Sequence, residues 1–315
     1  MKKLLSIIIP VYNEEKNVTL LYEQLLKVIK SLNEYRYEII FVDDGSTDQT
    51  WTEIKDINQK NTNVKGISLT RNFGHATALQ AGLESACGDA VIMMDGDLQH
   101  PPELIPKLVK EWKNGNKIVN TLRVDTKKIG LFKKTASNVF YKIMSYFSLI
   151  RINAGEADFR LIDKEVLGKI NNFPESPKFY RGIVHWIGYQ IVYVKYTAQE
   201  RKYGKSSYNL RKMTELARAG FTSFSVRPLK AIIAIGFLIF VTFSAVLMYT
   251  LFYKFLISYN GFSNSFVMVM LIMVVTGLMI CFQGVIAIYL VDIFNTSMGR
   301  PAYIVKSTLG QKNND

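Results

Sequence analysis

Cysteine and histidine are scarce in this 315-residue chain, which contains two cysteines and three histidines. Cys87 and Cys281 are far apart, and neither they nor the scattered His75, His100 and His185 show the spacing of metal ligands. We therefore expect no metal site built on these residues, and we expect both cysteines to be reduced packing residues. We expect His75 and His185 to be structural, whereas His100 follows an acidic run and is a candidate for tuning a site there.

A glycine-rich loop that could cradle phosphate is also missing. The segment DDGSTD at 43–48 is not GxGxxG, and GxxxxGK[ST] does not occur anywhere in the chain. These absences argue against a dinucleotide-binding fingerprint and against an ATP-binding P-loop.

We expect no signal peptide at the N-terminus. The opening MKKLLSIIIPVYNEE has a basic start, but its apolar run is short and ends at Pro10, with acidic residues following. We therefore expect the N-terminus to stay in the cytosol. The formal net charge of +13 is compatible with nucleic acid, an anionic membrane surface or a phosphorylated substrate, so the distribution of charge has to decide.

Two long uncharged segments, 231–253 and 266–290, lie toward the C-terminus. Each exceeds the roughly 20 residues that cross a bilayer core. The connection between them has one basic residue, and more basic residues flank the pair on its outer sides: Arg211, Lys212, Arg218, Arg227, Lys230, Arg300 and Lys306. This asymmetry predicts two transmembrane helices with both chain ends in the cytosol. A buried helix pair of a soluble protein is the alternative.

Two further segments, 131–149 and 206–229, are amphipathic. In each, apolar residues fall on one helical face and basic residues lie off it. We expect both to lie at a membrane surface, the second as a juxtamembrane helix, although ordinary core-facing helices would give the same pattern. An anionic lipid surface would then explain the basic excess without nucleic acid.

Short β-type runs alternate with helical patterns in the first half of the chain. Strands are predicted at 4–11, 37–44, 64–70 and 89–95, and helices at 15–32, 47–60, 75–86 and 102–113. This βαβ series predicts an α/β fold with a Rossmann-like, mostly parallel, doubly wound sheet. In such sheets ligands bind outside the carboxyl ends of the strands.

Polar clusters fall at three of these strand ends: PVYNEE, VDDGSTD and MDGDLQ. The last cluster places Asp95 and Asp97 one residue apart and Gln99 shortly after. A DxD pair alone is a weak signal, because it is usually only a solvated turn. A diphosphate without a glycine cradle commonly relies on a divalent cation, and Mg²⁺ or Mn²⁺ takes such hard oxygen ligands. We predict that these three residues hold a metal ion that stabilises the diphosphate leaving group of a nucleotide-sugar.

The combination of SIIIPVYNEE, VDDGSTDQT, DGDLQHPPE and two apolar spans resembles the inverting family 2 glycosyltransferases of the GT-A fold. Within that family it is similar to the polyprenyl-phosphate glycosyltransferases, of the bactoprenol glucosyltransferase and dolichol-phosphate mannose synthase type. The resemblance covers essentially the whole chain.

The resemblance implies roles for individual residues. Asp95, Asp97 and Gln99 match the metal and diphosphate motif, and Asp158 in GEADFRLID matches the position of the catalytic base. A lipid phosphate is largely ionised at neutral pH, so Asp158 is expected to orient substrate groups as much as to take a proton. The nucleotide pocket would be lined by Pro10, Tyr12, Glu14, Asp43, Asp44 and Asp95. The side chains around the sugar, the diphosphate and the acceptor phosphate would be Arg123, Arg160, Arg201, Lys205 and Ser206. The alternatives without a functional role are a surface ion pair of Asp158 with Arg160 and a solvated basic face at 201–218.

The implied activity is inverting, metal-dependent transfer of a hexose or N-acetylhexosamine from a UDP-sugar to undecaprenyl phosphate. The product would serve cell-surface glycan modification, at the cytosolic face of the cell membrane. The expected organisation is a catalytic domain at 1–205, a juxtamembrane helix at 206–229, two spans at 230–292 and a cytosolic tail at 293–315. A homo-oligomer is expected, with a lipid-sugar flippase and a downstream transferase as partners. The transferred sugar stays open, including mannose from a GDP-sugar.

Three alternatives compete with this interpretation. A processive polysaccharide synthase would need more spans and a QxxRW motif, and RGIVHW at 181–186 does not supply one. A non-catalytic membrane partner would not require the acidic motif, Asp158 and Arg201 together. A nucleic-acid-binding protein would need a basic face carrying aromatics, whereas the basic residues cluster near the spans.

Overall fold

The computed structural model describes residues 2–124, 155–173, 178–197 and 301–310, and isolated positions between 268 and 299. The chain divides into two units, one made of 1–145, 150–216 and 301–315 and the other of 146–149 and 217–300. Several predictions lie outside the described residues: the amphipathic segments 131–149 and 206–229, the first span, and the roles of Arg201, Lys205 and Ser206.

The second unit is described only at helical positions between Met268 and Ser297 and at Gly299. Large apolar side chains are exposed at several of them: Met268, Ile272, Met279, Ile286, Leu290 and Ile293. Within the part of the chain that is described, no helix has the length and apolar character needed to cross a bilayer.

The first unit begins with the four strands expected from the sequence: β1 (Leu4–Val11), β2 (Arg36–Asp43), β3 (Val64–Leu69) and β4 (Ala90–Met93). They pair in parallel, in the order β4-β1-β2-β3. Their apolar runs are almost continuously buried, which is the pattern of strands covered on both faces.

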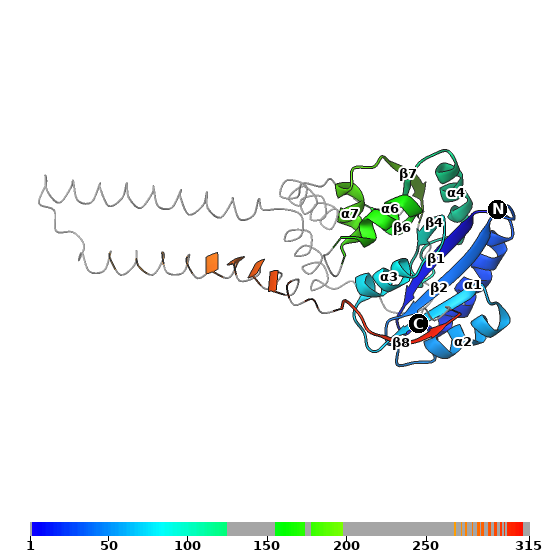
Figure 1. Cartoon of the computed structure of the whole chain (residues 1–315), viewed down its shortest axis with the longest axis horizontal. Coiled ribbons are helices and arrows are strands. Elements are labelled where there is room, and N and C mark those ends of the chain that lie inside the picture. Colours follow the sequence, from blue (N-terminus) through cyan, green and yellow to red (C-terminus); the bar gives the residue numbers. More distant parts are fainter. Residues whose placement is uncertain are drawn as a thin grey trace, which may run out of the picture. The chain divides into compact units, whose positions relative to one another are not determined.

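Helices cover both faces of this sheet (Figure 1). The connections contain α1 (Glu15–Ile29), α2 (Thr50–Lys60), α3 (His75–Glu84), the short 3₁₀ helix η1 (Pro102–Leu104) and α4 (Ile105–Lys113). Helix α1 packs its buried Leu21 and Leu25 in one core with Ile7 and Phe41. Helix α3 packs on the other face, where a Cβ added at Gly82 would meet Ile8 Cγ2 at 2.3 Å. The predicted helices are thus confirmed, with shorter ends.

The complete sheet has eight strands in the order β7-β5-β6-β4-β1-β2-β3-β8. The added strands are β5 (Ile118–Arg123), β6 (Glu156–Asp163), β7 (Ile191–Tyr196) and β8 (Val305–Leu309). Strand β6 runs antiparallel to both β4 and β5, and β8 runs antiparallel to β3. The α/β class is confirmed, but the sheet is mixed because the chain reverses into β6 beside β4 instead of crossing over once more.

Two helices follow β6, namely α6 (Lys164–Asn171) and α7 (Tyr180–Trp186). Strand β8 comes from the segment expected to be a cytosolic tail, and it joins the outer edge of β3. Two further contacts hold this segment: the Tyr303 hydroxyl donates to Glu84 Oε2 at 2.7 Å, and the Thr70 N–H donates to the Ile304 carbonyl at 3.0 Å. Residues 301–310 therefore belong to the first unit.

Cys87 departs from its expected role as a packing residue. Its thiol is free and exposed. The residue lies in the connection from α3 to β4, where its backbone N–H donates to the buried Glu38 carboxylate at 2.8 Å. The backbone, not the sulfur, has the structural role.

Candidate active site

The carboxyl end of β4 carries the loop with the two predicted metal-binding carboxylates. Gly96 separates Asp95 from Asp97, and a Cβ at this position would lie 2.7 Å from Val11 Cγ1, so the close approach of the loop to β1 requires glycine. Leu98 is 4% exposed and has a φ of 62°, an unfavourable conformation that its burial holds in place. The Gln99 N–H donates to Asp97 Oδ1 at 3.1 Å, which closes the turn.

Two histidines contact Asp95. The Asp95 N–H donates to His100 Nδ1 at 3.1 Å, and His100 Nε2 lies 3.8 Å from Asp95 Oδ2. His100 is 6% exposed and stacks on Phe159 with ring centroids 5.2 Å apart. His75, the first residue of α3, places Nε2 3.4 Å from Asp95 Oδ1. His100 therefore fixes the Asp95 backbone, and His75, at the start of α3, contacts the Asp95 carboxylate.

The donor set at this loop suits a hard divalent cation that is shared with a substrate. Among the described residues, no group of three or more His, Cys, Asp and Glu is arranged to hold a metal ion. Mg²⁺, however, is commonly bound by one or two carboxylates together with substrate phosphates. Asp95 and Asp97 supply those carboxylates, and the Asp95 side chain is 33% exposed. The residues fit a metal that arrives with a diphosphate, not a closed protein cage.

The antiparallel strand β6 carries the second group of charges to the same end of the sheet, where the parallel strands terminate. Met93 of β4 pairs with Arg160 of β6. Continuing this register by two residues brings Asp158 level with Asp95. The predicted metal-binding residue therefore follows β4, and the predicted base lies on the adjacent strand β6, although the two are far apart in sequence.

Asp158 is held by two arginines. Arg181 of α7 donates from Nε to Oδ1 at 2.8 Å and from Nη2 to Oδ2 at 2.6 Å, and Arg160 donates to Oδ1 at 3.3 Å. Burial alone would raise the pKa of Asp158. The charge and hydrogen bonds of Arg181, together with the charge of Arg160, outweigh burial and hold this pKa well below its usual value. Asp158 is therefore an anion at any physiological pH.

Arg160 lies beneath the site and is fully buried. It donates to the Ala157 carbonyl at 3.0 Å, and its Nη2 lies 3.9 Å from Glu156 Oε1. Glu156 accepts from Asn120 Nδ2 at 2.6 Å and lies 3.0 Å from His185 Nε2. Burial lowers the pKa of Arg160 while both carboxylates raise it, and a guanidinium keeps its charge in proteins. The alternative of a surface ion pair between Asp158 and Arg160 is wrong, because Arg160 has no exposed surface.

Tyr196 and Arg123 complete the described site at the ends of two paired strands. Tyr196, at the end of β7, packs edge-on against His100 with ring centroids 6.2 Å apart. Burial raises the pKa of Tyr196 to about 12, with further electrostatic effects from Arg123, Asp95 and Asp97. Arg123, at the end of β5, is exposed. The tyrosine thus stays neutral among the charges, and the arginine reaches solvent.

The predicted nucleotide-binding carboxylates at the end of β2 hold loops. Asp44 accepts the backbone N–H groups of Phe73 at 2.7 Å and Gly74 at 2.9 Å, and Asp43 accepts the Ser68 hydroxyl at 3.0 Å. Both aspartates are almost completely buried, and burial raises the pKa of Asp44. These bonds fix the loop that leads into His75, while contact with a nucleoside stays a prediction.

The remaining predicted nucleotide-binding residues lie at the end of β1. Pro10 is buried within the strand, Tyr12 just beyond it is 44% exposed, and Glu14 is partly buried. The Glu14 backbone N–H donates to Thr50 Oγ1 at 2.8 Å. All three therefore lie at the same end of the parallel strands as Asp95, while their contact with a nucleotide stays a prediction.

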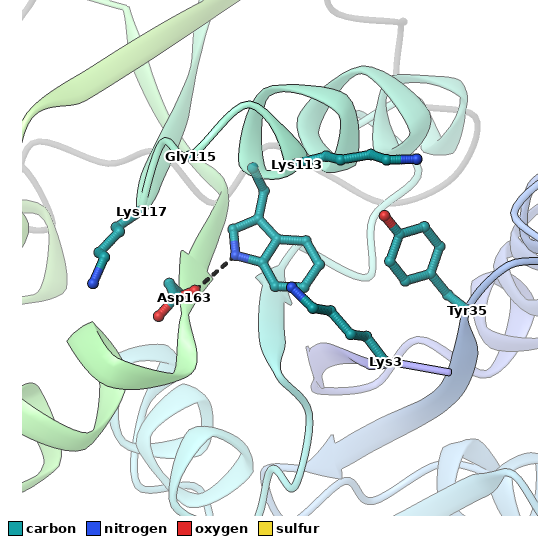
Figure 2. Close-up of a pocket in the computed structure, with 7 residues that line it drawn as sticks. Lys3, Tyr35, Lys113, Gly115, Lys117 and Asp163 are labelled. Atoms are coloured by element: carbon teal, nitrogen blue, oxygen red, sulfur yellow. Dashed lines mark hydrogen bonds between the residues drawn. The ribbon is translucent and has the colours of Figure 1, made fainter. Parts of the chain in front are cut away.

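A separate pocket of about 340 Å³ lies at the opposite edge of the sheet, where β1 and β5 begin (Figure 2). Trp112 of α4 donates to Asp163 Oδ2 at 2.8 Å, and Lys3 Nζ lies 4.6 Å from the centroid of the indole ring. These contacts attach α4 to the sheet. The pocket contains none of the predicted site residues.

The sheet, the carboxylate loop after β4 and the charged strand β6 define an α/β nucleotide-sugar transferase of the GT-A type. The sequence model described as "Glycosyl transferase family 2" matches residues 6–170, which is more than half of the chain. The chain belongs to glycosyl transferase family 2 and is a glycosyltransferase, which confirms the resemblance seen in its motifs.

Relatives match this chain over nearly its whole length. The uncharacterized glycosyltransferase YkcC of Bacillus subtilis is 35% identical over 98% of this chain and 95% of its own. The bactoprenol glucosyl transferase of Shigella phage SfX is 34% identical over 96% of this chain and 99% of its own. Among solved structures, glucosyl-3-phosphoglycerate synthase from Mycobacterium tuberculosis in complex with Mn²⁺, UDP-glucose and phosphoglyceric acid has a TM-score of 0.50 and 18% identity. The match covers 70% of this chain and 78% of that one, and it shows the shared fold.

His75 and Tyr196, beside the carboxylate loop, were not predicted as site residues. Three more residues that were not predicted there, Arg181, Glu156 and His185, surround Asp158 and Arg160. His75 and His185 were expected only to be structural. One sequence feature could have indicated the group around Asp158: Glu156, Asp158 and Arg160 alternate along one strand, so they share a face. Buried charges on one face require counter-charges from elsewhere, and α7 supplies them.

Proposed function

We propose that this enzyme transfers a hexose or N-acetylhexosamine from a UDP-sugar to a polyprenyl phosphate, in bacteria undecaprenyl phosphate, with inversion at the anomeric carbon. The observation that carries the proposal is that the Asp95 and Asp97 carboxylates follow β4, while Asp158 and its arginines belong to the adjacent strand β6 and to α7. His75 links the two groups, because its ring contacts Asp95 and its charge acts on Asp158. The Shigella phage relatives are named bactoprenol glucosyl transferase, which supports the lipid acceptor. The mycobacterial synthase was crystallised with UDP-glucose, which supports a UDP-sugar donor.

A divalent cation, Mg²⁺ or Mn²⁺, would be held by Asp95, Asp97 and Gln99. When bound, it would neutralise charge on the diphosphate as that group departs. The chain itself positions these ligands: Gly96 allows the loop to approach Val11, and His100 fixes the backbone of Asp95. The mycobacterial synthase was crystallised with Mn²⁺, which supports this part of the proposal.

The transfer needs one nucleophile and one leaving group. A phosphate oxygen of the acceptor forms a bond to the anomeric carbon as the bond from that carbon to the diphosphate oxygen breaks, and the electron pair leaves with the nucleoside diphosphate. Attack from the face opposite the leaving group inverts the anomeric carbon. No covalent enzyme intermediate is required, and the site would need only to align the two phosphates.

We further propose that the enzyme acts at the cytosolic face of the cell membrane, held there by the two spans within 230–292. A lipid phosphate lies at that surface, so anchoring brings acceptor and catalytic unit together. Exposed apolar side chains such as Met268, Met279 and Leu290 support an apolar surrounding for the second predicted span. Association into a homo-oligomer, and cooperation with a flippase and a downstream transferase, are predictions of the same proposal.

A donor panel tests the proposal. Detergent-purified enzyme is incubated with undecaprenyl phosphate and radiolabelled UDP- or GDP-sugars, in the presence of Mg²⁺, Mn²⁺ or EDTA. We expect one donor to give a labelled product that partitions into organic solvent and disappears with EDTA. The absence of a lipid product from every donor, with folded protein and metal present, would contradict the proposal.

Asp97→Ala tests the metal site in the same assay. Loss of a carboxylate ligand should reduce transfer by more than the ~10–100-fold that loss of an outer-shell partner of a metal ligand typically costs. Asp56→Ala is the matched control, because Asp56 is exposed on α2, far along the chain from the carboxylate loop, and it should retain full activity. Normal turnover by Asp97→Ala would refute the metal assignment.

A further inference from the structure

The contacts of Asp158 are unusual for a residue that is expected to take a proton. Its Oδ1 accepts from Arg181 Nε at 2.8 Å and from Arg160 Nη2 at 3.3 Å, and its Oδ2 accepts from Arg181 Nη2 at 2.6 Å. An ionised carboxylate has about four lone-pair positions. The contacts from described residues use three of them, and the position that remains is on Oδ2.

Arg181 comes from a different element and holds the carboxylate in one orientation. Its fork makes two parallel hydrogen bonds, the geometry that restricts a carboxylate most. The side chain of Arg181 is 25% exposed and that of Asp158 is 20% exposed, so the pair lies at the surface of the site, whereas Arg160 behind it is fully buried. The Asp158 carboxylate is therefore partly open to solvent at the surface of the site, where a substrate group could approach the remaining Oδ2 position.

The proposed reaction does not need a protein base when the acceptor is fully ionised. A dianionic phosphate that attacks the anomeric carbon becomes a monoanionic phosphodiester, and no proton has to leave. The second pKa of a phosphate monoester is about 6, so most of the acceptor is a dianion at neutral pH. A proton acceptor would gain importance only below that pH.

We propose that Arg181 is a positioning residue that keeps Asp158 as a permanently charged, oriented hydrogen-bond acceptor for a hydroxyl group of the donor sugar, and not as a general base. The proposal rests on the proposed function, whose acceptor is a phosphate. If it is right, the fall in rate at low pH reflects protonation of the acceptor phosphate and not of Asp158.

The charges around Asp158 come from three elements. Arg181 faces it from α7, Arg160 and Glu156 belong to its own strand β6, and His75 acts on it from α3. Removing Arg181 takes away the largest favourable charge, so burial would then raise the pKa of Asp158 toward or above its ordinary value. Asp158 would then take up a proton at a higher pH than it does in the wild-type enzyme.

A second acceptor with a different pKa distinguishes protonation of the acceptor from protonation of Asp158 as the cause of the fall in rate at low pH. The pH dependence of kcat/KM is measured for the wild-type enzyme with a polyprenyl phosphate and with the matching polyprenyl phosphonate, whose second pKa is higher. We expect the fall in rate at low pH to move upward with the phosphonate by the difference between the two acceptor pKa values. A fall that stays at one pH with both acceptors, and that disappears in Asp158→Asn, would overturn the proposal.

Variants of Arg181 supply the second measurement. Arg181→Met should show an additional fall at low pH that does not depend on the acceptor, and Arg181→Lys should move back toward the wild type. Arg36→Met is the matched control, because Arg36 is exposed at the start of β2, at the opposite edge of the sheet, and it should keep the wild-type profile. A wild-type profile in Arg181→Met would overturn the proposal.

The outcomes separate this inference from the proposed function. If the wild-type enzyme forms no lipid-linked product, both are refuted. If product forms and kcat/KM falls at the same low pH with both acceptors, the proposed function stands and the inference alone fails. The acceptor comparison uses only wild-type protein, so it decides the question even if an Arg181 variant does not fold.

Discussion

At the scale of single residues, the buried charges behind the site make a testable contribution to stability. The Glu156 side chain has no exposed surface, and it accepts from Asn120 and contacts His185 while facing Arg160. Glu156→Ala leaves the buried guanidinium with Asp158 as its carboxylate partner on β6 and leaves two polar groups without an acceptor. Leaving a buried polar group without its hydrogen-bond partner costs about 1–3 kcal/mol, so we expect a clear fall in the midpoint of thermal unfolding.

The control for this prediction is Glu23→Ala. Glu23 is exposed on α1, so its replacement should not change the unfolding midpoint measurably. Equal midpoints for the two variants would show that the charges behind the site do not contribute to stability as the geometry indicates.

The site residues that could be predicted from sequence belong to short local motifs, most of them at a strand end. Asp95 and Asp97 follow an apolar run whose length and composition indicate a strand. Arg181 could not be found in this way, because its importance comes from contact with Asp158 across a connection that no local pattern describes. Cys87 was misjudged for a related reason, since its position next to a strand indicated burial while the fold exposes it.

At the scale of elements, strand β8 is a part of the sheet that was not predicted from the sequence, because its segment was expected to be a cytosolic tail. It comes after the predicted spans, yet it pairs with β3 and so protects the outer edge of the sheet. Deleting residues 301–315 would leave the hydrogen-bonding groups of that edge of β3 unpaired, and unpaired edges promote association with other chains. We expect the truncated protein to unfold at a lower temperature and to aggregate in size-exclusion chromatography.

Two smaller changes serve as controls for the deletion of residues 301–315. Deleting only residues 311–315 keeps β8 and should preserve the elution position. Tyr303→Phe removes one hydrogen bond, to Glu84, and should cost about 1 kcal/mol. Wild-type behaviour of the full truncation would mean that β8 is dispensable for the catalytic unit.

The strands that could be predicted differ from the rest in how their partners are chosen. Strands β1–β4 are linked by helices in a regular series, so the alternation of strand and helix patterns is sufficient to predict them as strands of one parallel sheet. Strand β6 inserts between β4 and β5 in the opposite direction, and β8 arrives from the far end of the chain. Such pairings are decided by side chains distant in sequence, and hydropathy alone contains no information about them.

At the scale of the whole molecule, the exposed thiol of Cys87 offers a direct test of orientation in the membrane. The catalytic unit is proposed to face the cytosol, and Cys281 lies within the second predicted span. A membrane-impermeant maleimide should therefore fail to label intact cells and should label Cys87 in inside-out vesicles. Because a thiolate must be free and accessible to react, the exposed position favours efficient labelling.

The two cysteines make this test internally controlled. Cys87→Ala should remove the label from inside-out vesicles, since a thiol within the bilayer core is hidden from an impermeant reagent, and Cys281→Ala should leave the label unchanged. Labelling of Cys87 in intact cells would place the catalytic unit outside the cell, away from the cytosolic pool of nucleotide-sugars. Labelling of Cys281 by the same reagent would instead argue that the segment at 266–290 is not buried in lipid, and the anchoring that the proposal requires would have to come from another part of the chain.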